Sequence, residues 1–147
     1  MTDQIEVAEL HNQPVIKLQT PDGAVALVSL FGAQVLSWTP AGGEDRLYLS
    51  PQAVFDGRSA IRGGVPVCFP QFGDRGPLPR HGFARQRRWV VSNTRAGKEY
   101  AVATLSPINS TAAPIETPAF IPRERSATLS AISRASAMSM PISGTYV

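Results

Sequence analysis

Short alternating runs of apolar residues, each bounded by turn residues, occupy the first fifty positions and limit the folds open to this chain. Residues 14–20 alternate between apolar and polar side chains, and a period of two predicts a strand with one buried face. Residues 24–30 and 33–39 form further apolar runs, and the Pro-Asp-Gly sequence at 21–23 is a turn signal before them. Because no segment combines a helical period with a cap, the pattern predicts an all-β sandwich or barrel.

Three more short runs fit the same pattern. Residues 46–49, 89–92 and 100–105 favour strands, with a turn at 96–97 between the last two. Residues 50–88 are instead rich in Gly, Pro and Arg. A loop of this length inside a compact domain is usually functional, so we expect the site to lie there.

The sequence changes character at about residue 108. From there Ser, Ala, Thr and Pro dominate, and no clear strand or helix period persists. Such a composition buries too little apolar area to offset the entropy of ordering the chain. We therefore predict two parts: residues 1–107 as the N-terminal portion of a β-sandwich, and residues 108–147 as a low-complexity tail that is poorly ordered or out of frame.

A single cysteine narrows the chemistry. The 147 residues fit one domain, and one cysteine excludes an internal disulfide and a cysteine-based zinc site. Cys68 stands in an apolar run and is predicted to be a buried structural thiol. The chain opens without a charged-then-apolar signal and contains no apolar run of about 18 residues. We expect a cytoplasmic protein with no membrane partner, no metal and no cofactor.

Arginine dominates the positive charge. Of the 14 basic residues only Lys17 and Lys98 are lysines, in a chain of net charge +3. Arginine presents a planar fork of donors that matches pairs of phosphate or carboxylate oxygens. Six arginines fall between residues 62 and 88. This cluster indicates a small anionic ligand, and the alternatives are a solvated basic surface and a nucleic-acid-binding face.

Arg62 begins the first of two segments that stand out in this region. It precedes Gly63 and Gly64, which permit backbone angles that other residues avoid and let a ligand approach closely. The competing interpretation is a glycine turn with an incidental arginine.

His81 lies in the second segment, between Arg80 and Arg85, and three interpretations of it are open. It can act as a general acid or base near neutral pH, donate a hydrogen bond to a ligand hydroxyl, or serve as a satisfied structural residue. On residue chemistry alone, binding ranks first and proton transfer second. His11, the other histidine, stands in a polar context and is predicted to lie on the surface.

The order of residues in these segments resembles a known family. Residues 32–38, Gly-Ala-Gln-Val-Leu-Ser-Trp, resemble the early strand of the galactose mutarotase-like superfamily. Residues 60–72 together with 78–85, which read Leu-Pro-Arg-His-Gly-Phe-Ala-Arg, resemble its hexose-6-phosphate mutarotases, the glucose-6-phosphate 1-epimerases. The resemblance extends roughly over residues 5–106 and corresponds to the front half of such a protein.

This resemblance implies part of a β-supersandwich and an isomerase that interconverts the α and β anomers of hexose 6-phosphates. By position, Arg62 and Arg85 are similar to the arginines that hold the phosphate. Arg80 stands where some relatives bind substrate with glutamine, and His81 is similar to the site-lining histidine of a His-Gly motif. The implied substrate-binding residues are Arg62, Arg80, His81 and Arg85. The implied partner is a small hexose 6-phosphate and not a nucleic acid.

The catalytic acid and base of that family have no counterpart here. In the family the acid is a histidine in a Leu-His-Thr-like strand and the base is a late glutamate. No histidine follows His81 in this chain, and Glu99, Glu116 and Glu124 stand in other contexts. No catalytic residue is therefore matched, with His81 as a secondary candidate, and the chain alone is expected to be inactive. The alternatives are a non-catalytic sugar-phosphate-binding module and a basic nucleic-acid-binding protein.

A chain that forms only half of a β-sandwich is also expected to associate with itself. Strands such as residues 24–30 lack their partners, and exposed edges with an uncovered apolar face favour self-association. We expect the chain to oligomerise or aggregate if it folds alone.

Overall fold

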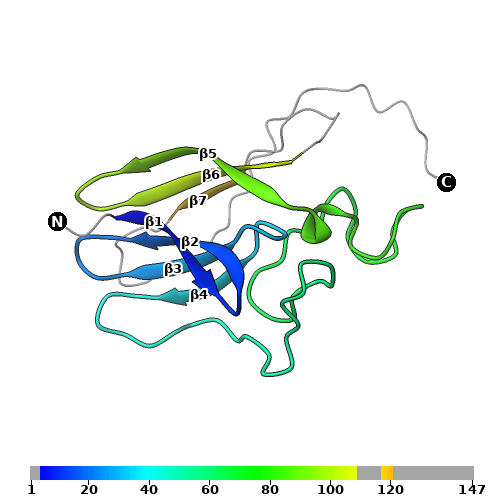
Figure 1. The fold of residues 1–147 in the computed structure, drawn as a ribbon, viewed down its shortest axis with the longest axis horizontal. Helices are drawn as coiled ribbons and strands as arrows, with labels where there is room; N and C mark the ends of the chain where they lie inside the picture. Colours follow the sequence, from blue (N-terminus) through cyan, green and yellow to red (C-terminus); the bar gives the residue numbers. More distant parts are fainter. Residues whose placement is uncertain (1–3, 109–116, 121–147) are drawn as a thin grey trace.

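Two antiparallel sheets make up the computed structural model, which describes residues 4–108 and 117–120 (Figure 1). The first sheet has the order β1-β2-β3-β4, with β1 at Ile5–Leu10, β2 at Gln13–Gln19, β3 at Val25–Ser29 and β4 at Val35–Thr39. The second has the order β5-β6-β7, with β5 at Trp89–Ala96, β6 at Ala101–Pro107 and β7 at Thr117–Phe120. Within the described residues the one helical segment is the 3-10 turn η1, Ala84–Gln86. The predicted all-β class is confirmed.

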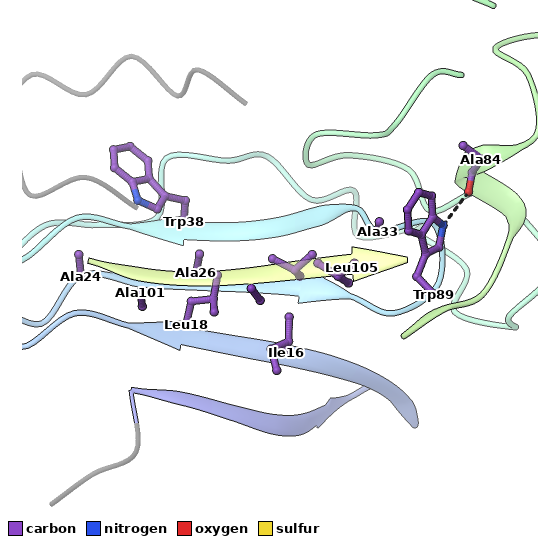
Figure 2. Close-up of a cluster of buried hydrophobic side chains, with 12 residues drawn as sticks. Ile16, Leu18, Ala24, Ala26, Ala33, Trp38, Ala84, Trp89, Ala101 and Leu105 are labelled. Carbon is purple, nitrogen blue, oxygen red and sulfur yellow. Dashed lines mark hydrogen bonds between the residues drawn. The ribbon is translucent and has the colours of Figure 1, made fainter. Parts of the chain in front are cut away.

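The core lies between the two sheets and draws side chains from both (Figure 2). Its largest members are Ile16, Leu18, Trp38, Trp89 and Leu105. Burying a side chain of this size stabilises the fold by about 1.5–3 kcal/mol. Small residues fill the space between them, among them Ala26 on β3 and Ala101 on β6. The alternation in the sequence therefore predicts burial correctly, because the apolar faces of the strands meet in one core layer.

Strand β2 is buried on both of its faces. Ile16 and Leu18 point into the main core, as their alternation predicts. Val15, on the opposite face, is 1% exposed because it packs in a second cluster with Phe31, Leu36 and Ile61. The second cluster joins the sheet to the segment after β4, which carries the candidate residues.

Two strand predictions differ from the structure. Residues 46–49 do not form a strand, and Leu49 makes only an isolated bridge to Gly63. Strand β1 was not predicted, because residues 5–10 do not show an apolar alternation. It forms through a two-residue hairpin in which His11 and Asn12 both have positive φ, 50° and 59°. Such turns match the twist of paired strands and usually contain Gly, so this pair gave no clear signal.

Cys68 corrects a further expectation. The thiol is free and half-buried, not fully buried, and it lies in the long loop between β4 and β5. Within the residues that the structure describes, no helix has the length and apolar character to cross a membrane.

The region beyond residue 107 is described only at Ile108 and β7. The N–H of Ile108 donates to the Arg88 carbonyl oxygen at 2.9 Å. Strand β7 pairs with Val102–Leu105 of β6. These four residues form the third strand of the second sheet. The rest of the predicted tail lies outside the described residues, so the boundary at 107 stays a prediction, as does self-association.

Asp45 ties the turn after β4 back to that strand. Its Oδ1 accepts the N–H of Trp38 at 3.0 Å and that of Leu47 at 2.9 Å. The Trp38 carbonyl in turn accepts the N–H of Arg46 at 2.8 Å. Burial raises the pKa of Asp45, but hydrogen bonds from the Ser37 side chain and from these backbone groups outweigh it and hold the pKa below its usual range.

Replacing this carboxylate should change the acid side of the stability profile. Because the folded pKa is lowered, the stabilisation is present above the unfolded pKa of about 3.9 and is lost as pH falls through the folded value. Asp45→Asn should lower the free energy of unfolding at neutral pH by up to about 1 kcal/mol, a small effect because the group is largely exposed. The difference from the parent chain should vanish in acid. Urea unfolding at several pH values measures this difference in the free energy of unfolding, and Glu44→Gln is the charge-matched control.

Candidate functional site

The connection between β3 and β4, residues 30–34, and the first residue of β4 hold both arginine-bearing parts of the chain. We call residues 61–65 the first arginine segment and residues 80–88 the second. The N–H of Val65 donates to the Val35 carbonyl at 2.8 Å, which attaches the first segment. The N–H of Gly32 donates to the Arg87 carbonyl at 2.7 Å, which attaches the second.

Gln34 fixes the backbone on both sides of Arg62. Its side chain is buried, and its Nε2 donates to the carbonyl oxygens of Ile61, at 3.1 Å, and of Gly63. The Arg62 carbonyl accepts the N–H of Ser50 at 3.1 Å. The Arg62 side chain itself is exposed. The backbone is therefore held in place while the guanidinium faces solvent, as an anion-binding arginine requires.

Gly63 and Gly64 pack against the protein's own backbone. Both have positive φ, at 112° and 57°. A Cβ at Gly64 would lie well inside 3.0 Å of the Val35 carbonyl oxygen, and one at Gly63 would meet the Tyr48 carbonyl. The predicted need for glycine is correct, but the close approach at these positions comes from neighbouring strands and loops. The glycines serve to place Arg62 against the sheet.

Arg85 is the most constrained of the candidate arginines. It lies in η1, and the Trp89 indole N–H fixes this turn by donating to the Ala84 carbonyl at 3.2 Å (Figure 2). Gly32 lies directly against the Arg85 backbone, where a Cβ would come within 2.6 Å of the carbonyl oxygen. The half-buried side chain donates from Nη2 to the Arg80 carbonyl at 2.9 Å. Its Nε is buried and has no hydrogen-bond partner in the described part of the chain.

His81 is held in one orientation by the Gly73 backbone. Its N–H donates to the Gly73 carbonyl at 2.9 Å, and its Nδ1 accepts the Gly73 N–H at 3.1 Å. Because Nδ1 accepts, the neutral ring carries its proton on Nε2. In that neutral ring Nε2 is therefore a donor, which fits binding better than action as a base.

Arg80 contributes its backbone more than its side chain. Its carbonyl holds the Arg85 guanidinium, whereas its own guanidinium is exposed. It forms an ion pair with Asp74, with Nε and Oδ2 separated by 4.0 Å and the two side chains 69% and 77% exposed. A pair this exposed contributes at most about 1 kcal/mol. The Arg80 side chain thus lies on the exposed surface beside the Arg85 side chain, where it is free to turn toward an anion.

Gln71 organises the loop before His81, and the sequence interpretation did not include it. Its side chain exchanges two hydrogen bonds with the Leu78 backbone, donating to the carbonyl at 3.0 Å and accepting the N–H at 3.0 Å. It also donates to the Gly73 carbonyl at 3.2 Å. The sequence signal for this role was a glutamine, whose amide is both donor and acceptor, in a loop rich in Pro and Gly.

The two arginine segments converge on one end of the sandwich. Gly32 contacts the backbone of Arg85, and the Gln34 side chain donates to the carbonyls on either side of Arg62. Two residues of chain span at most about 7 Å, so both anchors lie on the same short stretch. In Figure 1 the loops that carry them gather beyond one end of the strands.

A hollow of about 530 Å³ is lined by His11, Leu49, Ser50, Pro51, Ala53 and Phe55. It borders the first arginine segment, because the Ser50 N–H donates to the Arg62 carbonyl. None of the four candidate residues lines it. His11 is exposed, as predicted, and its ring lies on Phe55 with centroids 4.6 Å apart. In residues 4–108 and 117–120 no group of three or more His, Cys, Asp or Glu could hold a metal ion.

Comparison with protein families gives a match to the model of the aldose 1-epimerases over residues 14–113. A *Cenchrus ciliaris* protein is 52% identical over 68 residues, which is 46% of this chain and 21% of that protein. An *Escherichia coli* (strain K12) protein is 50% identical over 70 residues, or 46% of this chain and 24% of that protein. Both carry the provisional name glucose-6-phosphate 1-epimerase.

Solved structures agree with this match. The protein HI1317 superposes with a TM-score of 0.72 and 30% identity, covering 83% of this chain and 45% of its own. A protein from *Salmonella typhimurium* titled as a mutarotase (YeaD) superposes with a TM-score of 0.67 and 31% identity, covering 82% of this chain and 43% of its own. The match to this chain thus covers less than half the length of either structure.

Proposed function

The chain belongs to the aldose 1-epimerase family, and from this premise we propose that it binds hexose 6-phosphates and supplies the phosphate-gripping part of a cytoplasmic mutarotase. The observation that carries the proposal is the Arg85 guanidinium. It is fixed on the Arg80 carbonyl, and its Nε–H is buried with no partner in the described chain. A buried donor without a partner costs about 1–3 kcal/mol. In this proposal the half-buried side chain turns when the ligand arrives, and a phosphate oxygen then accepts this N–H and removes that cost.

The reaction of such a site is the exchange of α and β anomers. A base takes the proton from the anomeric hydroxyl while an acid protonates the ring oxygen, and the bond between C1 and the ring oxygen breaks. The open aldehyde rotates about C1–C2 and closes on its other face. On closure the base returns its proton to the C1 oxygen and the acid takes its proton back from the C5 hydroxyl, so the sugar is neither oxidised nor reduced.

Arg62 and Arg85 are assigned to the phosphate in this proposal. A guanidinium offers parallel N–H donors to two oxygens at once, and both backbones are anchored on the β3–β4 connection. His81 would donate from Nε2 to a sugar hydroxyl. Arg80, exposed at the rim, would add a longer-range attraction.

A non-catalytic binding module is the second candidate, and one observation favours it. The Nδ1 of His81 accepts the Gly73 N–H, so Nε2 is a donor in the neutral ring. In this second proposal the residues that resemble the family's site only bind the ligand, and none of them is assigned as the acid or the base. A nucleic-acid-binding protein is the third candidate. Titration with glucose 6-phosphate and with an oligonucleotide at several salt concentrations separates it, because many phosphate contacts give a steep salt dependence.

Removal of either arginine should weaken phosphate binding. Each charge-assisted contact contributes about 1.5–3 kcal/mol, so Arg85→Ala should raise the Kd for glucose 6-phosphate roughly ten- to a hundredfold. Arg62→Lys should also weaken binding, because an ammonium cannot replace the fork. Calorimetric titration measures both.

Arg95→Ala is the matched control, since this exposed arginine on β5 carries the same charge away from the site. It should change the Kd less than twofold. Equal affinity for glucose and glucose 6-phosphate, or an equal loss in Arg95→Ala and Arg85→Ala, would remove the phosphate-site assignment.

A further inference from the structure

Phe72 is an exposed aromatic residue on a well-anchored loop. Its side chain is 67% exposed, although phenylalanine is usually buried. Gln71 on one side is hydrogen-bonded across the loop to Leu78, and Gly73 on the other is paired with His81. The loop therefore holds the ring outward by fixing both of its neighbours.

The Phe72 ring lies beside the binding groups already described. Its centroid is 5.0 Å from that of the His81 ring, at an interplanar angle of 68°. His81 directly follows Arg80, whose carbonyl holds the Arg85 guanidinium at 2.9 Å. An apolar face, a hydrogen-bond donor and a fixed cation are thus adjacent along one surface.

The other phenylalanines of this loop have partners of their own. Phe69 and Phe83 pack edge to face with centroids 6.4 Å apart, and Arg87 lies over the Phe83 ring at 5.6 Å. Their side chains are 39% and 37% exposed, against 67% for Phe72. Phe72 is therefore the ring of this group with the most free face to offer.

We propose that Phe72 is the platform on which the pyranose ring of a hexose 6-phosphate lies, so that it selects for the sugar while the arginines select for phosphate. This inference rests on the proposed function. A pyranose has a face of C–H groups with slight positive charge, and the face of a phenyl ring is negative. Ligand sites commonly combine such an apolar surface with a few fixed polar groups.

The test compares two probes, glucose 6-phosphate and inorganic phosphate, on the full 147-residue chain. Phe72→Leu removes the aromatic face but keeps an apolar side chain. It should weaken glucose 6-phosphate binding about two- to tenfold, the range expected for aromatic contacts, and leave the Kd for inorganic phosphate unchanged. Phe72→Tyr keeps the ring and should bind both probes as the parent chain does. Val7→Ala, an exposed residue on β1, is the control for loss of surface apolar area.

Each outcome separates the platform from the phosphate site. If Phe72→Leu leaves the Kd for glucose 6-phosphate unchanged, or raises the Kd for both probes equally, Phe72 is not a sugar platform. The phosphate site is retained in either case. If the parent chain binds neither probe, or Arg85→Ala changes neither Kd, the proposed function and the platform both fall. In the chain with glucose 6-phosphate bound, the ring-proton NMR signals of Phe72 should shift, and those signals should not move with inorganic phosphate.

Discussion

The 147-residue chain is expected to leave the exchange between the α and β anomers of glucose 6-phosphate at its uncatalysed rate. Arginines that hold the phosphate bind the ground state and the transition state about equally, and such uniform binding does not speed the chemical step. Positioned proton transfer contributes about 10²–10⁴-fold, and the proposed function assigns neither the acid nor the base to a residue of this chain.

His81 cannot readily supply both functions alone. The acid must be protonated while the base is not, and the two act on different oxygens of one sugar. Its Nδ1 accepts the Gly73 N–H, which leaves the neutral ring one N–H, on Nε2. A donor of this kind positions a hydroxyl, but it does not remove the proton from it.

Magnetisation-transfer NMR on fresh protein follows the anomer exchange directly. The parent chain, His81→Ala and Arg85→Ala should all give the rate of buffer alone. A clear acceleration by the parent chain that disappears in His81→Ala would instead make His81 catalytic and overturn its assignment to binding.

Gly64→Ala should destabilise the fold by about 2–5 kcal/mol. The strain of a side chain at positive φ costs about 1–2 kcal/mol, and forcing an added methyl against fixed backbone costs about 1–3 kcal/mol more. Here the added Cβ would overlap the Val35 carbonyl oxygen, which already accepts the N–H of Val65. Relief requires the first arginine segment to move away from the sheet, and Arg62 would move with it.

Gly42→Ala provides the control because only one of the two costs applies to it. Gly42 has φ of 65°, close to the 57° of Gly64, but no atom lies within 4 Å of its added Cβ. Urea unfolding should therefore show a difference of about 1–3 kcal/mol between the two variants. This difference is the cost of the overlap between the added Cβ and the Val35 carbonyl oxygen. Equal stability losses would mean that the Val35 contact is not tight.

The regular strands were predictable because their burial follows from local pattern. Residues 14–20 alternate, and Ile16 and Leu18 lie in the core as that alternation requires. The hairpin at His11 and Asn12 was not predictable, since its positive φ values occur without glycine. Residues 46–49 show the reverse case, since a run that favours a strand makes only one isolated bridge, between Leu49 and Gly63.

The candidate site was predictable in its residues but not in its arrangement. Arg62, His81 and Arg85 stand in motifs that the sequence shows directly. The unpartnered Nε of Arg85 depends on how η1 packs against the β3–β4 connection, which no local pattern contains. The tautomer of His81 likewise depends on a contact with Gly73, eight residues earlier.

The backbone bonds along β4 also decide where the sheet can grow. The Trp38 N–H and carbonyl are taken by Asp45 and Arg46, and the Val35 carbonyl is taken by Val65. Addition of an incoming strand requires free backbone groups in a row, and along β4 this row is interrupted by the chain's own loops. An additional segment, from the same chain or from another molecule, would therefore find a continuous ladder only at another edge of the two sheets. The loop that presents the arginines thus also shields β4 from intermolecular pairing.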